Sequence, residues 1–315
     1  MKNAKWLKLL AMVVAASNVG AKGLACIGSC HEYTTQNVIP ILPASGGEDG
    51  GIPPAESMDI LCNVHCPNAD SCTEITIQQP DGPAIPALEC VTHSTCGAGR
   101  RPGGLLTAEM PELPPSAQWF VQAAQLEAAS VSAFRLLRRD LRAYGAPRSF
   151  LRQASRAARE EKRHARRMRA LAKRAGVATR KPIVVPTNVP SFEEMVCQNA
   201  VEGCIRETFG ALVAHHQFEH ARDAEFRGAM RRIAKEEAHH AALARRIDMW
   251  AQKRLSPDAR LRIVLARQTA ARDLLFASAK VVDARTRNAL GLPDACTEAS
   301  LVKTMVVILD KQGAI

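Results

Sequence analysis

The feature that most constrains the fold is a pair of Glu-x-x-His motifs, each inside a segment with the apolar periodicity of a long helix. The motifs are Glu161–His164 and Glu237–His240. Because positions i and i+3 share one helix face, both side chains of a motif project together. A lone glutamate precedes each motif, and the spacing from Glu127 to the first motif nearly equals that from Glu202 to the second. The chain therefore carries two copies of one predicted helical hairpin.

These glutamates lie on apolar stripes that should face a core. Glu127, for example, is flanked at helical spacing by Ala123, Ala124 and Val131. A carboxylate buried alone is costly, so something must neutralise it. Two metal ions shared by four carboxylates and two imidazoles would do so, and this is the ligand set of a di-metal site in a four-helix bundle. The predicted ligands are Glu127, Glu161, His164, Glu202, Glu237 and His240.

The heights of the ligands along the hairpins support this set in the first copy more than in the second. Glu127 and Glu161 stand at nearly equal separations before and after the turn at Gly145. At 1.5 Å per residue, both lie roughly 25 Å from that turn. In the second copy, Glu202 stands farther from the turn at Asp223 than Glu237 does, by roughly two helical turns. An irregular turn would absorb much of that offset.

Mixed oxygen and nitrogen ligands suit two iron ions or two manganese ions, with zinc as an occupant in vitro. The alternative interpretation is a surface helix with charge pairs, since one Glu-x-x-His motif is common by chance. Glu236 and His239 repeat the spacing but are rotated about 100° off the stripe, which predicts surface residues or residues behind the ligands. Glu207 is predicted to point elsewhere, with an extra carboxylate for the metals as the alternative. Three further histidines are predicted to be exposed or capping: His215, His216 and His220.

Composition along the chain predicts a mainly α protein of five parts. Residues 1–25 resemble a signal peptide, and residues 26–100 form a small acidic, cysteine-rich module with irregular or β structure. Residues 101–115 are a Pro/Gly linker. Residues 116–255 hold the four predicted bundle helices, and residues 256–315 add C-terminal helices. The loop between the second and third helices is long enough to cross the end of a bundle, as in the ferritin-like topology.

The N-terminal segment predicts export. It has three early lysines, an apolar run at Leu9–Ala16, and small residues at Gly23 and Ala25 before Cys26. The apolar run is too short and interrupted for a transmembrane span. Cys26 after the cleavage point leaves two alternatives open, a lipid anchor or simple cleavage. The predicted location is therefore periplasmic, cell-surface or secreted.

Seven of the ten cysteines lie between residues 26 and 96, a density that indicates disulfides in an exported chain. Their connectivity cannot be deduced. A metal site at Cys62-x3-Cys66 with His65 and His93 is the alternative. Further along, Cys197 and Cys204 are too far apart on one helix to bond to each other. Whether Cys197 pairs with Cys296 or with the odd cysteine of the N-terminal module, or with neither, is left open by the sequence.

Net charge divides the chain. Residues 26–115 carry −9, whereas residues 116–315 carry +16. The basic part is interpreted as a solvated helix face, or as attracted to the acidic module or to an anionic cell-surface component. Nucleic acid is not the predicted partner, because the chain begins like an exported protein and no aromatic residues interleave with the arginines.

Residues 116–255 resemble the ferritin-like superfamily, especially its bacterioferritin and rubrerythrin branch. The stretches Leu126–Val131, Val201–Thr208 and Lys235–His240 are similar to those of uncharacterised exported bacterial ferritin-like proteins. The resemblance implies two bridging carboxylates, two terminal carboxylates and one histidine on each ion: Glu161 and Glu237, Glu127 and Glu202, His164 and His240. The chain lacks the rubredoxin-type cysteines of rubrerythrins, and its added modules do not fit a ferritin cage.

The function expected from this resemblance is that of an exported di-iron or dimanganese protein reacting with dioxygen or peroxide, as an oxidase, peroxidase or ferroxidase. The alternative is a non-enzymatic cell-surface interaction or metal-binding module that uses the bundle structurally. Only two tyrosines, Tyr33 and Tyr144, are present to relay radicals or electrons, which keeps this alternative open.

Overall fold

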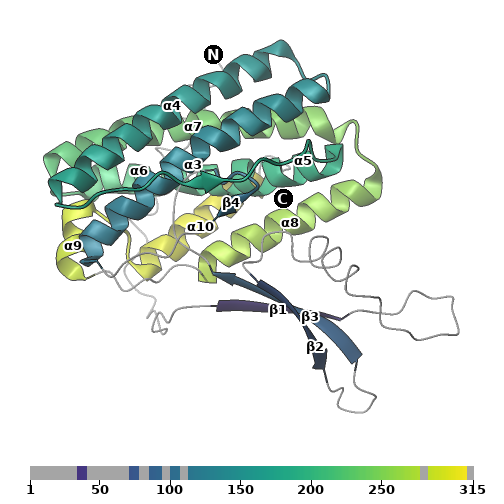
Figure 1. Cartoon of the computed structure of the whole chain (residues 1–315), viewed down its shortest axis with the longest axis horizontal. Helices are drawn as coiled ribbons and strands as arrows, with labels where there is room; N and C mark the ends of the chain where they lie inside the picture. Colours follow the sequence, from purple (N-terminus) through teal and green to yellow (C-terminus); the bar gives the residue numbers. More distant parts are fainter. Residues whose placement is uncertain are drawn as a thin grey trace, which may run out of the picture. The chain divides into compact units, whose positions relative to one another are not determined.

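The computed structural model describes residues 34–40, 71–77, 85–93, 100–106, 113–276 and 283–310. The predicted signal peptide, Cys26, the candidate metal ligands Cys62 and Cys66, and most of the cysteine-rich module lie outside these residues. The chain divides into two compact units, His31–Thr95 and the remainder. The expectation of a mainly helical protein is confirmed (Figure 1).

The first helical hairpin consists of α3, Pro115–Ala143, and α4, Arg148–Arg174, which pack along their lengths (Figure 1). Proline suits the first turn of α3, because a backbone N–H at that position has no hydrogen-bond acceptor within the helix. Its absence in proline therefore costs no hydrogen bond. Gly145 turns the chain with a φ of 67°, a conformation that favours glycine. The hairpin and its turn lie where the sequence predicts them.

The second hairpin is less regular. It begins with α5, Phe192–Gln198, continues without a break through the π-helix η1, Asn199–Arg206, and ends its first arm with α6, Glu207–His220. Its second arm is α7, Ala224–Gln252. Ser191 and Glu194 form a capping box at the start of α5, and Asp223 caps α7 by accepting a bond from the Phe226 backbone N–H at 2.8 Å. The sequence predicts the turn at Asp223 but not the π-helix.

A short ribbon ties the segment before the first hairpin to the segment after it. Strand β4, Leu105–Leu106, pairs antiparallel with β5, Ile183–Val184, in the loop after α4. Gly104, with a φ of 76°, lies so close to this loop that an added Cβ would stand 2.5 Å from the Val185 carbonyl oxygen. The ribbon therefore fixes residues 100–106 beside the first hairpin.

Three helices follow the second hairpin: α8, Pro257–Phe276; α9, Ala284–Leu290; and α10, Ala295–Asp310. Helices α8 and α10 pack against η1 and α6 around buried apolar side chains that include Ile205, Leu212, Leu301 and Met305. The sequence predicts α8 and α10. The short α9 is an addition, capped at its start by the Asp283 carboxylate.

The unit His31–Thr95 contains a three-stranded antiparallel sheet of order β1-β3-β2. Its strands are β1, Thr34–Pro40; β2, Ser71–Ile77; and β3, Ile85–His93. The sequence predicts irregular or β structure for residues 26–100 without placing the individual strands. Among the described residues, no helix is both long enough and apolar enough to cross a bilayer.

Candidate metal centre

Five of the six predicted ligands meet between the two hairpins, and Glu207 joins them. One group is Glu127, Glu161, His164 and Glu237, and a second is Glu207, Glu237 and His240. Within each group, one ligand atom per residue lies within 4.8 Å of the others. The six residues come from α3, α4, α6 and α7, so the centre exists only when both hairpins are packed together.

The first half of the centre surrounds His164. Its Nδ1 lies 3.3 Å from Glu127 Oε2, 3.7 Å from Glu161 Oε1 and 3.4 Å from Glu237 Oε1. The glutamates thus come from three different helices and converge on one imidazole nitrogen.

The second half surrounds His240 in the same way. Its Nδ1 lies 3.0 Å from Glu161 Oε1, 3.4 Å from Glu207 Oε2 and 3.6 Å from Glu237 Oε1. Glu161 and Glu237 therefore approach both histidines, whereas Glu127 approaches only His164 and Glu207 approaches only His240. This pattern gives two adjacent ligand sets that share two carboxylates.

The centre is buried, and most of the atoms that face one another in it lack hydrogen bonds. Glu161 and Glu207 are fully buried, and Glu237 is 1% exposed. Seven carboxylate oxygens of the four glutamates and the Nδ1 atoms of both histidines are buried and make no hydrogen bond within the described structure. An arrangement of this kind is costly unless cations compensate it. The donor set and its charge therefore fit two divalent metal ions.

Apolar layers close the centre on both sides along the helix axes. Phe134, Leu141 and Ile247 belong to the buried cluster on one side, and Phe120 and Met168 to the cluster on the other. The Phe134 ring lies 4.8 Å from the His240 ring, centroid to centroid. Water is thereby kept from the carboxylates, which strengthens every electrostatic interaction among them.

Burial and like charge shift the acid–base properties of the group. Burial, followed by the neighbouring carboxylates, raises the pKa of Glu127 and of Glu207 well above the usual glutamate range. Burial opposes protonation of His164 and His240, but the surrounding carboxylates outweigh it and raise the pKa of both imidazoles. Without cations, the cluster therefore retains protons that metal ions would displace.

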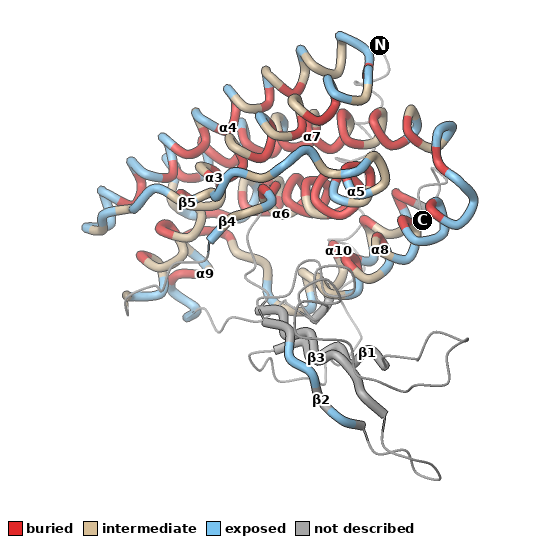
Figure 2. The backbone as a smooth tube through the Cα atoms, turned by 45° about the vertical axis from the view of Figure 1, so that its right-hand side comes forward, coloured by how far each residue is buried: buried red, intermediate tan, exposed pale blue. Residues whose placement is uncertain are grey.

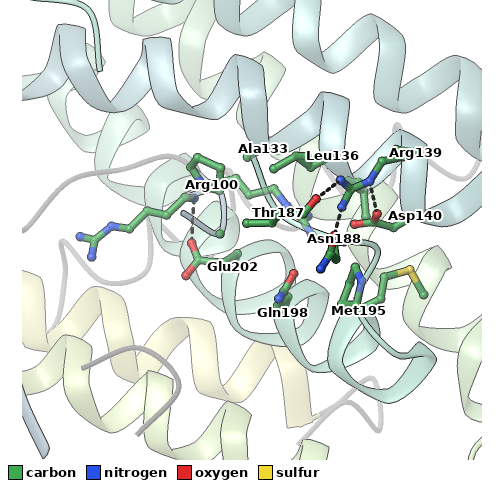
Figure 3. Close-up of a pocket in the computed structure, with 15 residues that line it drawn as sticks. Arg100, Ala133, Leu136, Arg139, Asp140, Thr187, Asn188, Met195, Gln198 and Glu202 are labelled. Carbon is green, nitrogen blue, oxygen red and sulfur yellow. Dashed lines mark hydrogen bonds and ion pairs between the residues drawn. The ribbon is translucent and has the colours of Figure 1, made fainter. Parts of the chain in front are cut away.

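Glu202 lies outside this cluster, contrary to the prediction. Its Oε2 accepts a hydrogen bond from the Arg101 backbone N–H at 2.9 Å (Figure 3), and its Oε1 lies 3.4 Å from Arg206 Nε. The physical reason is η1, in which the Glu207 N–H bonds the Glu202 carbonyl across a π-turn rather than an α-turn. Glu207 is thus placed one π-turn further along, at the level of the histidines.

The sequence carries a signal that Glu207, rather than Glu202, belongs to the centre. The signal is that Glu202 and Glu237 stand at unequal distances from the turn at Asp223. Glu207 stands nearly as far before Asp223 as Glu237 stands after it, whereas Glu202 is more than one helical turn farther from Asp223. Regular 3.6-residue periodicity cannot place Glu207 on the stripe of Glu202, because their spacing exceeds one α-turn. A π-turn makes them successive residues on one side of the helix.

Two further glutamates hold the histidines from behind, each reaching across to the other hairpin. Glu236 Oε2 lies 2.7 Å from His164 Nε2, and Glu160 Oε2 lies 3.1 Å from His240 Nε2. When Nε2–H donates to a carboxylate, the Nδ1 lone pair is left facing the cluster, as a metal ligand requires. The structure thus places Glu236 behind a ligand. Periodicity alone does not single out Glu160, although the doublet Glu160-Glu161 matches Glu236-Glu237.

Two arginines that reach the surface each hold one of these glutamates in place. Arg156 Nε lies 2.7 Å from Glu160 Oε1, and Arg163 Nη2 lies 2.9 Å from Glu236 Oε1. Burial opposes ionisation of Glu236, but the bonds from His164 and Arg163 outweigh it and lower its pKa to about 2. Both glutamates are therefore fixed carboxylates rather than free ligands.

A pocket of about 130 Å³ lies beside Glu202 and is lined also by Ala133, Leu137 and Met195 (Figure 3). Arg139 closes one wall by bonding Asp140 and the carbonyls of Thr187 and Asn188. Arg100 is buried at the other end, where its Nη1 donates to Asn199 Oδ1 at 3.3 Å and its guanidinium lies 5.7 Å from the centre of the Phe134 ring.

The other histidines of α6 and α7 do not join the ligand groups. His216 is buried, contrary to the prediction, and stacks on His220 with ring centroids 4.0 Å apart. The His220 ring bonds the His216 carbonyl near the end of α6. Neither His215 nor His239 joins the ligand groups formed by the described residues.

The cysteines of the second hairpin also lie apart from the centre. Cys197 and Cys204 are free thiols, so neither of the two pairings left open for Cys197 forms. Burial raises the pKa of Cys204 to about 12. Cys204 is therefore a buried neutral thiol that packs in the core, as its sequence context suggests.

Comparison of the chain with protein-family models, with curated proteins and with solved structures finds no match. The class of site is therefore defined by its own geometry: a buried group of carboxylates and histidines between helices that could hold metal ions.

Proposed function

We propose that this protein is a ferritin-like di-metal carboxylate protein, with two iron or manganese ions held in a four-helix bundle formed by α3, α4, η1–α6 and α7. The observation that carries the proposal is the set of buried carboxylate oxygens and Nδ1 atoms that face one another without hydrogen bonds. Four carboxylates and two divalent cations give a neutral centre, which is the condition for burying such charges.

Each residue has a role that follows from its distances. Glu161 and Glu237 approach both histidines and would bridge the two ions. Glu127 with His164, and Glu207 with His240, would complete the two ends. Glu207 takes the role first assigned to Glu202. Glu160 and Glu236 would keep each imidazole turned so that Nδ1 faces the ions.

When bound, two redox-active ions would supply electron transfer to dioxygen or peroxide, so oxidase, peroxidase or ferroxidase chemistry is the proposed activity. The protein's own part is to exclude water with Phe134 and Phe120, and to hold four carboxylates that can change their mode of coordination. The predicted export, with cleavage before Cys26, is part of the same proposal and would place this chemistry outside the cytoplasm.

The test is metal loading followed by oxidation. The full chain is purified without metal, titrated with ferrous iron under nitrogen, and then exposed to dioxygen or peroxide while ferric absorption is followed. Two ferrous ions bound per chain, with continued oxidation of excess ferrous iron added as the electron donor, support the proposed redox activity. Failure to bind iron or manganese would contradict the site itself.

Binding of two ions without oxidation would favour the second candidate, a structural metal-binding module. One observation favours that reading. Tyr144 is the only tyrosine among the described residues. It lies at the end of α3, where its hydroxyl donates a hydrogen bond to the Pro190 carbonyl, and not near the centre. No described tyrosine is therefore placed to relay an electron to the proposed metals.

A further inference from the structure

The outer face of α4 is occupied almost entirely by positive charge. Eleven residues of this helix are exposed, and ten of them are arginine or lysine, the exception being Ala170. The two acidic residues of α4, Glu160 and Glu161, are both buried. Exposed residues recur along the whole helix (Figure 2), which at 1.5 Å per residue is about 40 Å long. Much of the net positive charge of residues 116–315 is thus concentrated on the ten exposed basic residues of α4, which form a ridge along the outer face of the helix.

Most of these charges lack an ion-pair partner among the described residues. Arg156, Arg167 and Arg174 pair with carboxylates. Within the described part of the chain, the other seven exposed basic residues of α4 form no ion pair. The central row is Arg152, Arg159 and Arg166, each about two helical turns from the next.

Such a ridge opposes the stability of its own helix. Like charges at spacings of three and four residues repel each other, each pair by a few tenths of a kcal/mol. The buried stripe of α4 already provides its packing, through Ala154, Met168 and Leu171. Packing therefore does not require the unpaired arginines, and a polyanion would relieve their repulsion while releasing its own counterions.

The chemistry of the face selects among anionic partners. The exposed basic residues cover an arc of roughly 160° around the helix at 100° per residue, so a flat surface touches only the middle rows, whereas a flexible chain can follow all of them. Insertion into lipid needs an exposed apolar face, and Ala170 is the only exposed apolar residue on α4. Base stacking needs exposed aromatic rings, and Phe150 of α4 instead packs edge-on against Trp250 at 6.3 Å.

We propose that the outer face of α4 binds a flexible linear polyanion that carries sulfate or phosphate groups and no bases. Arginine is suited to such groups, because its planar guanidinium bonds two oxygens at once, and eight of the ten exposed basic residues are arginines. The proposal is independent of the metal centre, since the ridge lies on the opposite side of α4 from Glu161 and His164.

The test measures binding of the full chain to heparin and to inorganic polyphosphate between 50 and 500 mM salt. The variant Arg152→Glu/Arg159→Glu/Arg166→Glu removes the central row. A matched control, Arg260→Glu/Arg272→Glu/Arg285→Glu, makes the same change in net charge at exposed positions on α8 and α9. We expect the α4 variant to bind at least about tenfold more weakly with a shallower salt dependence, and the control to retain most of the affinity.

Circular dichroism and thermal unfolding establish that both variants remain folded. Equal losses in the two variants would show that net charge, rather than this face, drives binding, and would overturn the proposal. Tighter binding to anionic lipid vesicles or to single-stranded DNA than to both polymers would also overturn it, because each would identify a different class of partner. Should the triple variant fail to fold, the single variant Arg159→Glu, with Arg260→Glu as its control, provides the same comparison.

Discussion

At the residue scale, the centre depends on which atoms face one another rather than on how many acids the chain contains. Glu202 and Glu207 are both buried on one arm, yet only Glu207 lies beside His240. Glu202 instead holds the segment before α3 through the Arg101 backbone N–H. The two glutamates therefore have separable roles, one toward metal and one toward the fold.

The first prediction separates them by substitution. We expect Glu207→Ala to lose the ion beside His240, or to bind it at least about tenfold more weakly, because one of its carboxylates is gone. Glu202→Ala should retain two ions per chain and lose thermal stability instead. Elemental analysis after loading with ferrous iron or manganese distinguishes the two, and an equal loss of metal in both variants would contradict the assignment.

The carboxylates behind the histidines give a second prediction. Glu236→Ala and Glu160→Ala should each weaken metal binding by about 10- to 100-fold, because the imidazole loses the acceptor that sets its tautomer. Glu→Gln at either position keeps an acceptor oxygen and should recover part of the loss. Calorimetric titration with manganese measures this, and unchanged affinity in both alanine variants would show that these glutamates only support folding.

His216 gives a third prediction, which concerns stability and pH. Burial, followed by the neighbouring His220, lowers its pKa to about 4, with His215 acting in the same direction and Asp294 opposing. The unfolded chain takes up this proton near pH 6.5 and the folded chain only near 4. Stability from neutral His216 is therefore complete above pH 6.5 and lost as pH falls toward 4.

We expect His216→Gln to reduce the loss of unfolding free energy between pH 6.5 and 4 by about 1–2 kcal/mol. Denaturant titrations at several pH values measure it. Parallel profiles for wild type and His216→Gln would contradict the argument.

At the element scale, the sequence predicts most of the helices and most of the centre, and the reason is periodicity. Glu127, Glu161, His164, Glu237 and His240 all lie on regular α-helices, so a 3.6-residue repeat places them correctly. Glu207 follows a π-helix, where that repeat fails. The β4–β5 ribbon and α9 were missed because two-residue strands and a two-turn helix carry too little pattern.

The π-helix gives a fourth prediction. A Cβ added at Gly203 would stand 2.5 Å from Ala244 Cβ and 2.8 Å from Arg100 Nη1. Gly203→Ala should therefore push η1 away from α7 and destabilise the protein by about 1–3 kcal/mol. Gly228→Ala is the control, because nothing lies within 4 Å of its added Cβ. It should stabilise α7 by about 0.5–1 kcal/mol.

Denaturant unfolding measures both glycine variants. Metal affinity of Gly203→Ala should also fall, since Glu207 follows directly after η1. A stable variant with unchanged metal binding would mean that η1 and α7 can separate without moving the centre, which would contradict the close packing described above.

At the scale of the whole molecule, the centre joins elements that are far apart in the sequence. Its ligands come from both hairpins, and the bonds Glu236–His164 and Glu160–His240 cross between them. Metal ions there would bind only the folded arrangement and would stabilise it by mass action. Cleavage of the signal peptide and disulfides in the cysteine-rich module remain predictions, and neither enters the argument for this centre.

The most direct test of the central claim is an anomalous difference map from crystals of the protein loaded with iron or manganese, recorded at the metal's absorption edge. We predict two peaks between α4 and α7, one beside Nδ1 of His164 with Glu127 and one beside Nδ1 of His240 with Glu207, both within reach of Glu161 and Glu237. A map with no peak at this position, or with peaks held by Glu202 in place of Glu207, would contradict the account.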